Sequence, residues 1–121
     1  MLSRLLEKWS SIAPEECKIV RDRASLFIVE FADDNINVLE VEKDFDYGNE
    51  KIPSIVLGAV MQCAAKRELC VALRYFHEEK EWGADLYSQD GIEDGKAFEC
   101  EHKSAAIALL TAYLEYLKGG A

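Results

Sequence analysis

The sequence predicts an α+β fold, a single-domain sandwich of antiparallel sheet and helices with the element order α-β-β-β-α-β-β-β-α. Three segments carry apolar residues at helical spacing, over 2–12, 54–68 and 105–118. Between these segments, short runs rich in β-branched and aromatic residues alternate with turn-forming residues, as strands do. A chain of 121 residues is long enough to bury a core of its own, so we expect one domain over 1–121.

The first half of the chain is expected to form one helix and three strands. Apolar residues recur at helical spacing over 2–12: Leu2, Leu5, Leu6, Trp9 and Ile12. Pro14 ends this helix, because the residue before a proline avoids the α region. The runs 17–20, 25–31 and 36–47 follow as strands, with the turn sequence ADDN before the last of them.

The second helix raises one ambiguity at its end. Pro53 fits a first helical turn, where its missing N–H is not needed, so we expect a helix over 54–68. The helix could continue through 69–77, because no Gly or Pro interrupts that run. However, HEEKEWG is typical of a polar hairpin tip. It favours two paired strands, CVALRYF and WGADLYS, over a long helix.

The chain is expected to end in a strand and a central helix. Residues 96–101 alternate as a strand does, and Ser104 is a suitable N-cap for a helix over 105–118. That helix is apolar nearly all round in its first two turns, which predicts burial on several sides. We expect one buried cluster of side chains from the helices and strands: Trp9, Phe27, Val41, Val60, Leu110, Leu114 and Leu117.

The charge of the chain is segregated. The formal net charge is −9, yet the segment 33–50 holds seven acids and one base, and the segment 78–101 holds nine acids and two bases. The remaining residues are therefore basic on balance. The negative potential of the two acidic segments disfavours nonspecific binding to nucleic acid and favours partners with a basic surface.

The run LEVEKDFDY, residues 39–47, concentrates this charge on one side of a strand. Glu40, Glu42, Asp44 and Asp46 share one parity, and apolar residues fill most of the other. A half-buried strand with its charged side in water gives the same pattern. The solvent-facing side of a strand usually carries both acidic and basic residues, however, because like charges side by side destabilise a sheet. We therefore interpret these four carboxylates as a partner-binding surface, or alternatively as a mimic of DNA phosphates.

Signatures of catalysis, cofactors and metals are weak in this sequence. The glycines form no phosphate-binding motif, the serines lie in no nucleophile-elbow context, and no zinc knuckle or calcium loop is present. We therefore expect no enzyme, no cofactor and no metal. The alternative of another class is a small thiol enzyme or metal-binding domain around Cys100 and His102, which share a strand parity.

The four cysteines are expected to be free, buried thiols in a cytoplasmic protein. No signal peptide and no apolar run long enough to cross a bilayer is evident, and a core of this size needs no disulfide. We therefore interpret all four as small hydrophobic residues: Cys17, Cys63, Cys70 and Cys100.

The last third of the chain carries a recognisable combination of elements. Residues 81–117 join a hairpin strand with a Trp, a loop, a last strand, and a helix that opens on small residues, SAAIALL. This combination resembles small phage and prophage accessory proteins of the ABA-sandwich type. The resemblance implies an accessory protein of a mobile element, and no residue role transfers with it.

These observations together predict a small acidic, non-enzymatic protein that binds a protein with a basic surface. A phage or mobile-element accessory protein or inhibitor fits this description. An immunity protein that neutralises a toxin fits it as well, and so does a DNA mimic. A structural subunit whose acidity serves only solubility would show the same charge. We expect no direct contact with nucleic acid and none with a membrane.

Overall fold

The computed structural model describes residues 2–22, 26–31, 37–42, 51–88 and 97–119. Its helices and strands follow the predicted order: α1 (Leu2–Ile12), β1 (Cys17–Asp22), β2 (Leu26–Phe31), β3 (Asn37–Glu42), α2 (Lys51–Lys66), β4 (Leu69–Phe76), β5 (Glu81–Ser88), β6 (Ala97–His102) and α4 (Ala105–Gly119). The α+β fold class predicted from the sequence is confirmed.

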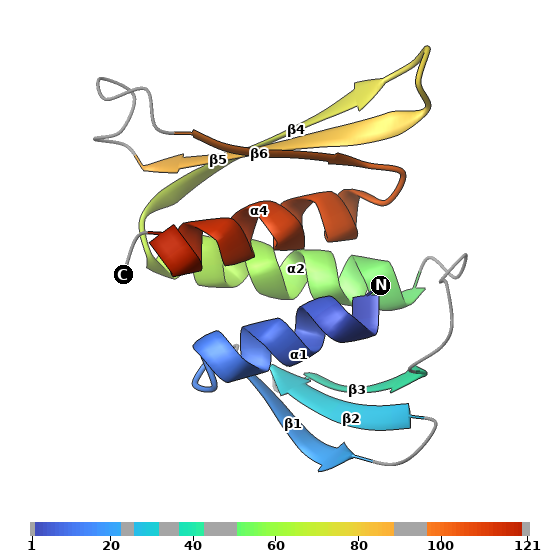
Figure 1. The fold of residues 1–121 in the computed structure, drawn as a ribbon, viewed down its shortest axis with the longest axis vertical. Helices are drawn as coiled ribbons and strands as arrows, with labels where there is room; N and C mark the ends of the chain where they lie inside the picture. Colours follow the sequence, from blue (N-terminus) through green and yellow to red (C-terminus); the bar gives the residue numbers. More distant parts are fainter. Residues whose placement is uncertain (1, 23–25, 32–36, 43–50, 89–96, 120–121) are drawn as a thin grey trace.

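The strands divide into two antiparallel sheets that enclose a layer of helices (Figure 1). One sheet has the order β1-β2-β3 and the other the order β4-β5-β6. Helix α4 packs against β5 and β6, and α1 packs against β1. Helix α2 lies against α4 and also contacts β4 and β3. The layers are therefore sheet, helices, sheet, and α4 contacts both other helices as well as β5 and β6.

The end of α2 decides the ambiguity over residues 69–77. The amide of Glu68 donates to the carbonyl of Ala65, and Glu68 itself has a φ of 60°. This left-handed conformation at the end of a helix turns the chain away from the helical path. Leu69 then starts strand β4, which pairs with β5 from Leu69 opposite Ser88 to Phe76 opposite Glu81. The predicted hairpin is confirmed, and the long helix is not formed.

One hydrophobic cluster joins the three helices to both sheets. Helix α4 buries residues on several sides because it has neighbours above and beside it, as its apolar composition predicted. Five of the seven predicted core residues are buried: Trp9, Val60, Leu110, Leu114 and Leu117. The side chains of the other two, Phe27 and Val41, lie outside the part of the chain that the structure describes.

Local signals in the sequence explain the helix starts. Pro53 is the third residue of α2, within the turn whose N–H groups have no partner inside the helix. The hydroxyl of Ser104 accepts a hydrogen bond from the amide of Ile107 at 3.4 Å, which is the N-cap predicted for α4. No helix in the described part of the chain is long and apolar enough to cross a membrane.

Candidate interaction surface

The predicted acidic row begins on strand β3. Backbone pairing places Glu40 opposite Ile28 and Glu42 opposite Leu26 on β2. Residue 39 is opposite the buried Val29, so positions 40 and 42 belong to the other face of this strand pair. Asp44 and Asp46 lie outside the described residues.

The two acidic segments do not form one continuous surface among the described residues. We expected the row on 39–47 to adjoin the acids of 78–101. Instead, Glu40 and Glu42 belong to the β1-β2-β3 sheet, whereas β5 and β6 belong to the sheet on the other side of the helices (Figure 1). The expectation is wrong for these residues because the strands divide into two sheets rather than one.

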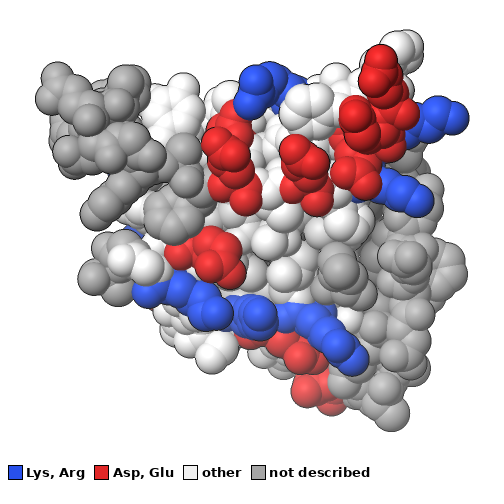
Figure 2. Space-filling view, turned by 45° about the horizontal axis from the view of Figure 1, so that its top comes forward, with Lys and Arg blue, Asp and Glu red and all other residues white. Residues whose placement is uncertain are grey.

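The outer face of the β4-β5-β6 sheet carries a second acidic group, which we call the acidic sheet face. Ala84 and Leu86 of β5 are fully buried against the helices, so alternate positions on β5 and their partners point away from the core. Four carboxylates occupy these outward positions: Glu81, Asp85, Glu99 and Glu101. Acidic side chains gather on this side of the molecule, with basic side chains interspersed at their edge (Figure 2).

The pairing of β5 with β6 sets two carboxylates directly against each other. Asp85 is opposite Glu99, and Glu101 is the next outward residue on the edge strand β6. Like charges at directly opposed positions destabilise an antiparallel pair. Glu99 and Glu101 are exposed, whereas the side chain of Asp85 retains 20% of its accessible surface. The face therefore concentrates negative charge at a cost to the sheet, and that charge is accessible.

Arg74 offsets part of this charge. Its Nη2 donates to Oδ2 of Asp85 at 2.9 Å, and its guanidinium lies 5.9 Å from the centroid of the Phe76 ring. Phe76 in turn covers Gly83, since a Cβ at that position would come within 2.6 Å of the ring. Arg74 is two-thirds exposed, and Asp85 is its ion-pair partner among the outward acids of the described residues. Glu99 and Glu101 therefore keep their charge available for a partner.

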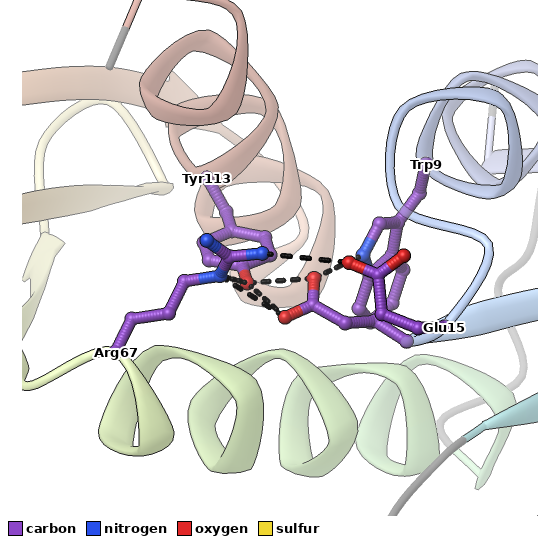
Figure 3. Close-up of polar contacts among 5 residues, drawn as sticks. Trp9, Glu15, Arg67 and Tyr113 are labelled. Carbon is purple, nitrogen blue, oxygen red and sulfur yellow. Dashed lines mark hydrogen bonds and ion pairs between the residues drawn. The ribbon is translucent and has the colours of Figure 1, made fainter. Parts of the chain in front are cut away.

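A second polar group is buried between the helices (Figure 3). Glu16, whose side chain is 12% exposed, accepts hydrogen bonds from Nε1 of Trp9 at 3.1 Å, from the hydroxyl of Tyr113 at 2.8 Å and from Nε of Arg67 at 3.1 Å. Nε of Arg67 also donates to the hydroxyl of Tyr113 at 2.9 Å. A weaker ion pair joins Arg67 to the exposed Glu15 at 3.8 Å. We call Trp9, Glu16, Arg67 and Tyr113 the polar cluster.

The contacts of the polar cluster are those of a group that stabilises the packing of the helices. Burial, followed by the hydrogen bond to Glu16, raises the pKa of Tyr113, so the phenol stays protonated. Each side chain of the cluster bonds to another member, and the members come from α1 (Trp9), from α4 (Tyr113), from the turn after α1 (Glu16) and from the turn after α2 (Arg67). Sequence reasoning did not identify this cluster, because its members are far apart in the chain and form no motif.

Cys100 and His102 are half-buried neighbours on one face of β6. The thiol of Cys100 donates to the carbonyl of Glu101 at 3.8 Å, whereas Nδ1 of His102 accepts from the amide of Ser104 at 3.0 Å. Burial is the main cause that raises the pKa of Cys100. A nucleophilic thiol needs a lowered pKa instead. The net shift in the pKa of Cys100 is therefore opposite in direction to that of an activated thiol.

All four cysteines are free thiols, as predicted. The predicted burial is confirmed for Cys17 and Cys63, whereas Cys70 and Cys100 are only half-buried. Within the ranges that the structure describes, no three His, Cys, Asp or Glu side chains are grouped as metal ligands. Comparison of the chain with protein-family models, with curated proteins and with solved structures gave no significant match. The resemblance to phage accessory proteins therefore stays a prediction.

Proposed function

We propose that this protein binds another protein through electrostatic contact between the acidic sheet face and a basic surface of the partner. The observation that carries the proposal is the direct opposition of Asp85 and Glu99, with Glu101 beside them on the edge strand. A sheet face that serves only solubility gains nothing from placing carboxylates opposite each other, since mixed charges would stabilise it better. A basic partner would relieve this repulsion on binding, which is the complementarity that drives fast and specific association.

The row Glu40, Glu42, Asp44 and Asp46 is proposed as a second contact surface for the same kind of partner. Its two described members, Glu40 and Glu42, belong to strand β3 of the other sheet, so one flat partner surface would not reach both β3 and β6 at once (Figure 1). The two surfaces are therefore separate hypotheses, and variants of each distinguish them.

The setting that we propose is the cytoplasm of a cell carrying a phage or another mobile element. Four free thiols would persist in that reducing compartment. An inhibitor of a host protein and an immunity protein both act by binding of this kind, without catalysis.

The test has two stages. Tagged protein is used to capture partners from a lysate at low ionic strength, and the captured partner is identified and purified. Its affinity is then measured for the wild type and for two double variants, Glu99→Gln/Glu101→Gln and Glu40→Gln/Glu42→Gln, at low and high ionic strength. Each variant removes two negative charges from one surface.

We expect Glu99→Gln/Glu101→Gln to weaken binding by roughly tenfold at low ionic strength and to reduce the salt dependence. The matched control is Glu7→Gln/Glu68→Gln, which removes the same charge from exposed positions on α1 and after α2. Equal affinities for the acidic-face variant and this control would overturn the proposal. If only Glu40→Gln/Glu42→Gln lowered the affinity, the partner would bind the β1-β2-β3 sheet instead.

A further inference from the structure

Three aromatic side chains form a row across the end of the β4-β5-β6 sheet, on the face opposite to the acidic sheet face. Tyr75 of β4 is directly opposite Trp82 of β5, and Trp82 is directly opposite His102 of β6. The rings of Tyr75 and Trp82 lie 5.2 Å apart, centroid to centroid, and are tilted by 56°. We call these three residues the aromatic row.

The aromatic row lies beyond the hydrophobic core. The next residues along the strands, Leu73 and Cys100, pack against the core, whereas Tyr75 is 47% exposed and Trp82 and His102 are half-buried. The β4–β5 hairpin extends past the first turn of α4, so its end has no helix beneath it (Figure 1). Large aromatic side chains that remain accessible on a strand pair are typical anchors of protein interfaces.

Acidic residues surround this end of the sheet. The hairpin turn carries Glu78 and Glu79, both exposed, and Glu81 follows at the start of β5. Lys80 and Lys103 are the nearby bases in sequence, and both are exposed. The accessible rings are therefore set in a region of net negative charge.

We propose that the aromatic row receives an arginine side chain of the basic partner, stacked on Tyr75 and Trp82. The inference rests on the proposed function and adds the kind of residue that the partner supplies. A cation is favoured over the face of Trp and Tyr rings, and a planar guanidinium stacks on such rings better than a lysine ammonium does. The turn carboxylates of Glu78 and Glu79 draw the cation to this end, and the rings select arginine.

The first test compares nona-arginine with nona-lysine, two peptides of equal charge, as ligands of the full-length protein. We expect the wild type to bind nona-arginine more tightly than nona-lysine. In Tyr75→Ser, the ratio of the two affinities should fall roughly fivefold. Tyr75→Ser leaves the net charge unchanged. The matched control is Tyr87→Ser, which removes a half-buried tyrosine from the outer face of the same sheet. An arginine preference that is the same in Tyr75→Ser as in the wild type would overturn the inference.

The second test needs no variant of the aromatic row. The protein has two tryptophans, so a nitrogen–proton correlation spectrum should contain two indole N–H signals. Trp9 is fully buried and donates its indole N–H to Glu16, so its signal is an internal reference. Addition of nona-arginine should shift the Trp82 signal and leave that of Trp9 in place. Shifts confined to Asp85, Glu99 and Glu101 amides would contradict the inference.

The two proposals fail in different ways. Binding of nona-arginine that is weakened by Glu99→Gln/Glu101→Gln but is indifferent to Tyr75→Ser would keep the proposed function and refute the role of the aromatic row. Binding that is indifferent to both variants would refute both.

Discussion

The hydroxyl of Tyr113 donates a hydrogen bond at 2.8 Å to the carboxylate of Glu16, which lies 97 residues earlier in the chain. The contact joins the last helix to the turn between α1 and β1. Arg67, at the end of α2, binds both residues, so one buried carboxylate connects segments from the beginning, the middle and the end of the chain. Loss of one member leaves its partners without a hydrogen bond in a partly buried site.

The polar cluster should therefore stabilise the packing of the helices measurably. We expect Tyr113→Phe to lower the free energy of unfolding by about 1–3 kcal/mol, because the substitution leaves Glu16 and Arg67 each short of one partner. Urea unfolding of the wild type, Tyr113→Phe, Glu16→Gln and the double variant measures the coupling between the two side chains.

The matched control for this prediction is Tyr75→Phe, which removes a hydroxyl from an exposed tyrosine. That change should alter stability by less than about 0.5 kcal/mol. If Tyr113→Phe and Tyr75→Phe changed the free energy of unfolding equally, the polar cluster would not stabilise the packing of the helices.

Helix α4 should be the main contributor to the core. Leu114 is 3% exposed within the cluster that joins both sheets to the helices. We expect Leu114→Ala to cost about 2–5 kcal/mol in thermal or urea unfolding, from lost burial and the cavity that remains. Met61→Ala, at a position of α2 that is 43% exposed, is the control and should cost less than about 0.5 kcal/mol. A small loss at Leu114 would mean that α4 is peripheral.

The buried thiol of Cys17 should make stability fall at alkaline pH. Burial, with smaller contributions from Cys63 and Glu16, raises the pKa of Cys17 from its ordinary value of 9.0 to about 12. Above pH 9 the unfolded chain loses a proton that the folded chain retains, so the unfolded state is favoured increasingly until the pH passes the folded pKa. This thiol should therefore reduce the free energy of unfolding by up to about 1.4 kcal/mol per pH unit between pH 9 and 12.

The measurement is urea unfolding of the wild type and of Cys17→Ala at three pH values. These are the ordinary pKa of a thiol, about 9, and roughly one pH unit below and above it. We expect the variant to be less stable at every pH, because it leaves a cavity, and its stability to decline less steeply above pH 9. If the stability of both proteins declined equally with pH, the pKa of Cys17 in the folded protein would not be raised. A thiol reagent should correspondingly modify Cys70 and Cys100 before Cys17 and Cys63.

Local patterns in the sequence were sufficient to predict the elements of this fold. Leu2, Leu6 and Trp9 recur at helical spacing and are all buried, and α1 has the predicted bounds. Pro53 and Ser104 mark helix starts by chemistry that acts within one turn. Each of these signals depends on neighbours in the sequence alone.

Long-range arrangement was not predictable in the same way. The division into two sheets depends on which strands pair, and Glu40 is separated from Glu99 because β3 pairs with β2 and β6 pairs with β5. The runs EECKIVR (residues 15–21) and ELCVALR (residues 68–74) are similar in sequence, but the structure offsets them by one residue. Cys17 begins β1 and is buried, whereas the core residue that begins β4 is Leu69, with Cys70 on the other face. Both halves nevertheless place a helix before a three-stranded sheet.

The central claim, that the acidic sheet face meets a basic partner, is tested most directly by the footprint of that partner on the protein. The measurement is the change in backbone amide signals of the nitrogen-labelled protein when the purified captured partner is added. We predict that the largest changes fall on β5 and β6 around Asp85, Glu99 and Glu101, and that they diminish as salt is raised. Changes that fall instead on α1 or on strands β1 and β2, and that persist at high salt, would contradict the claim.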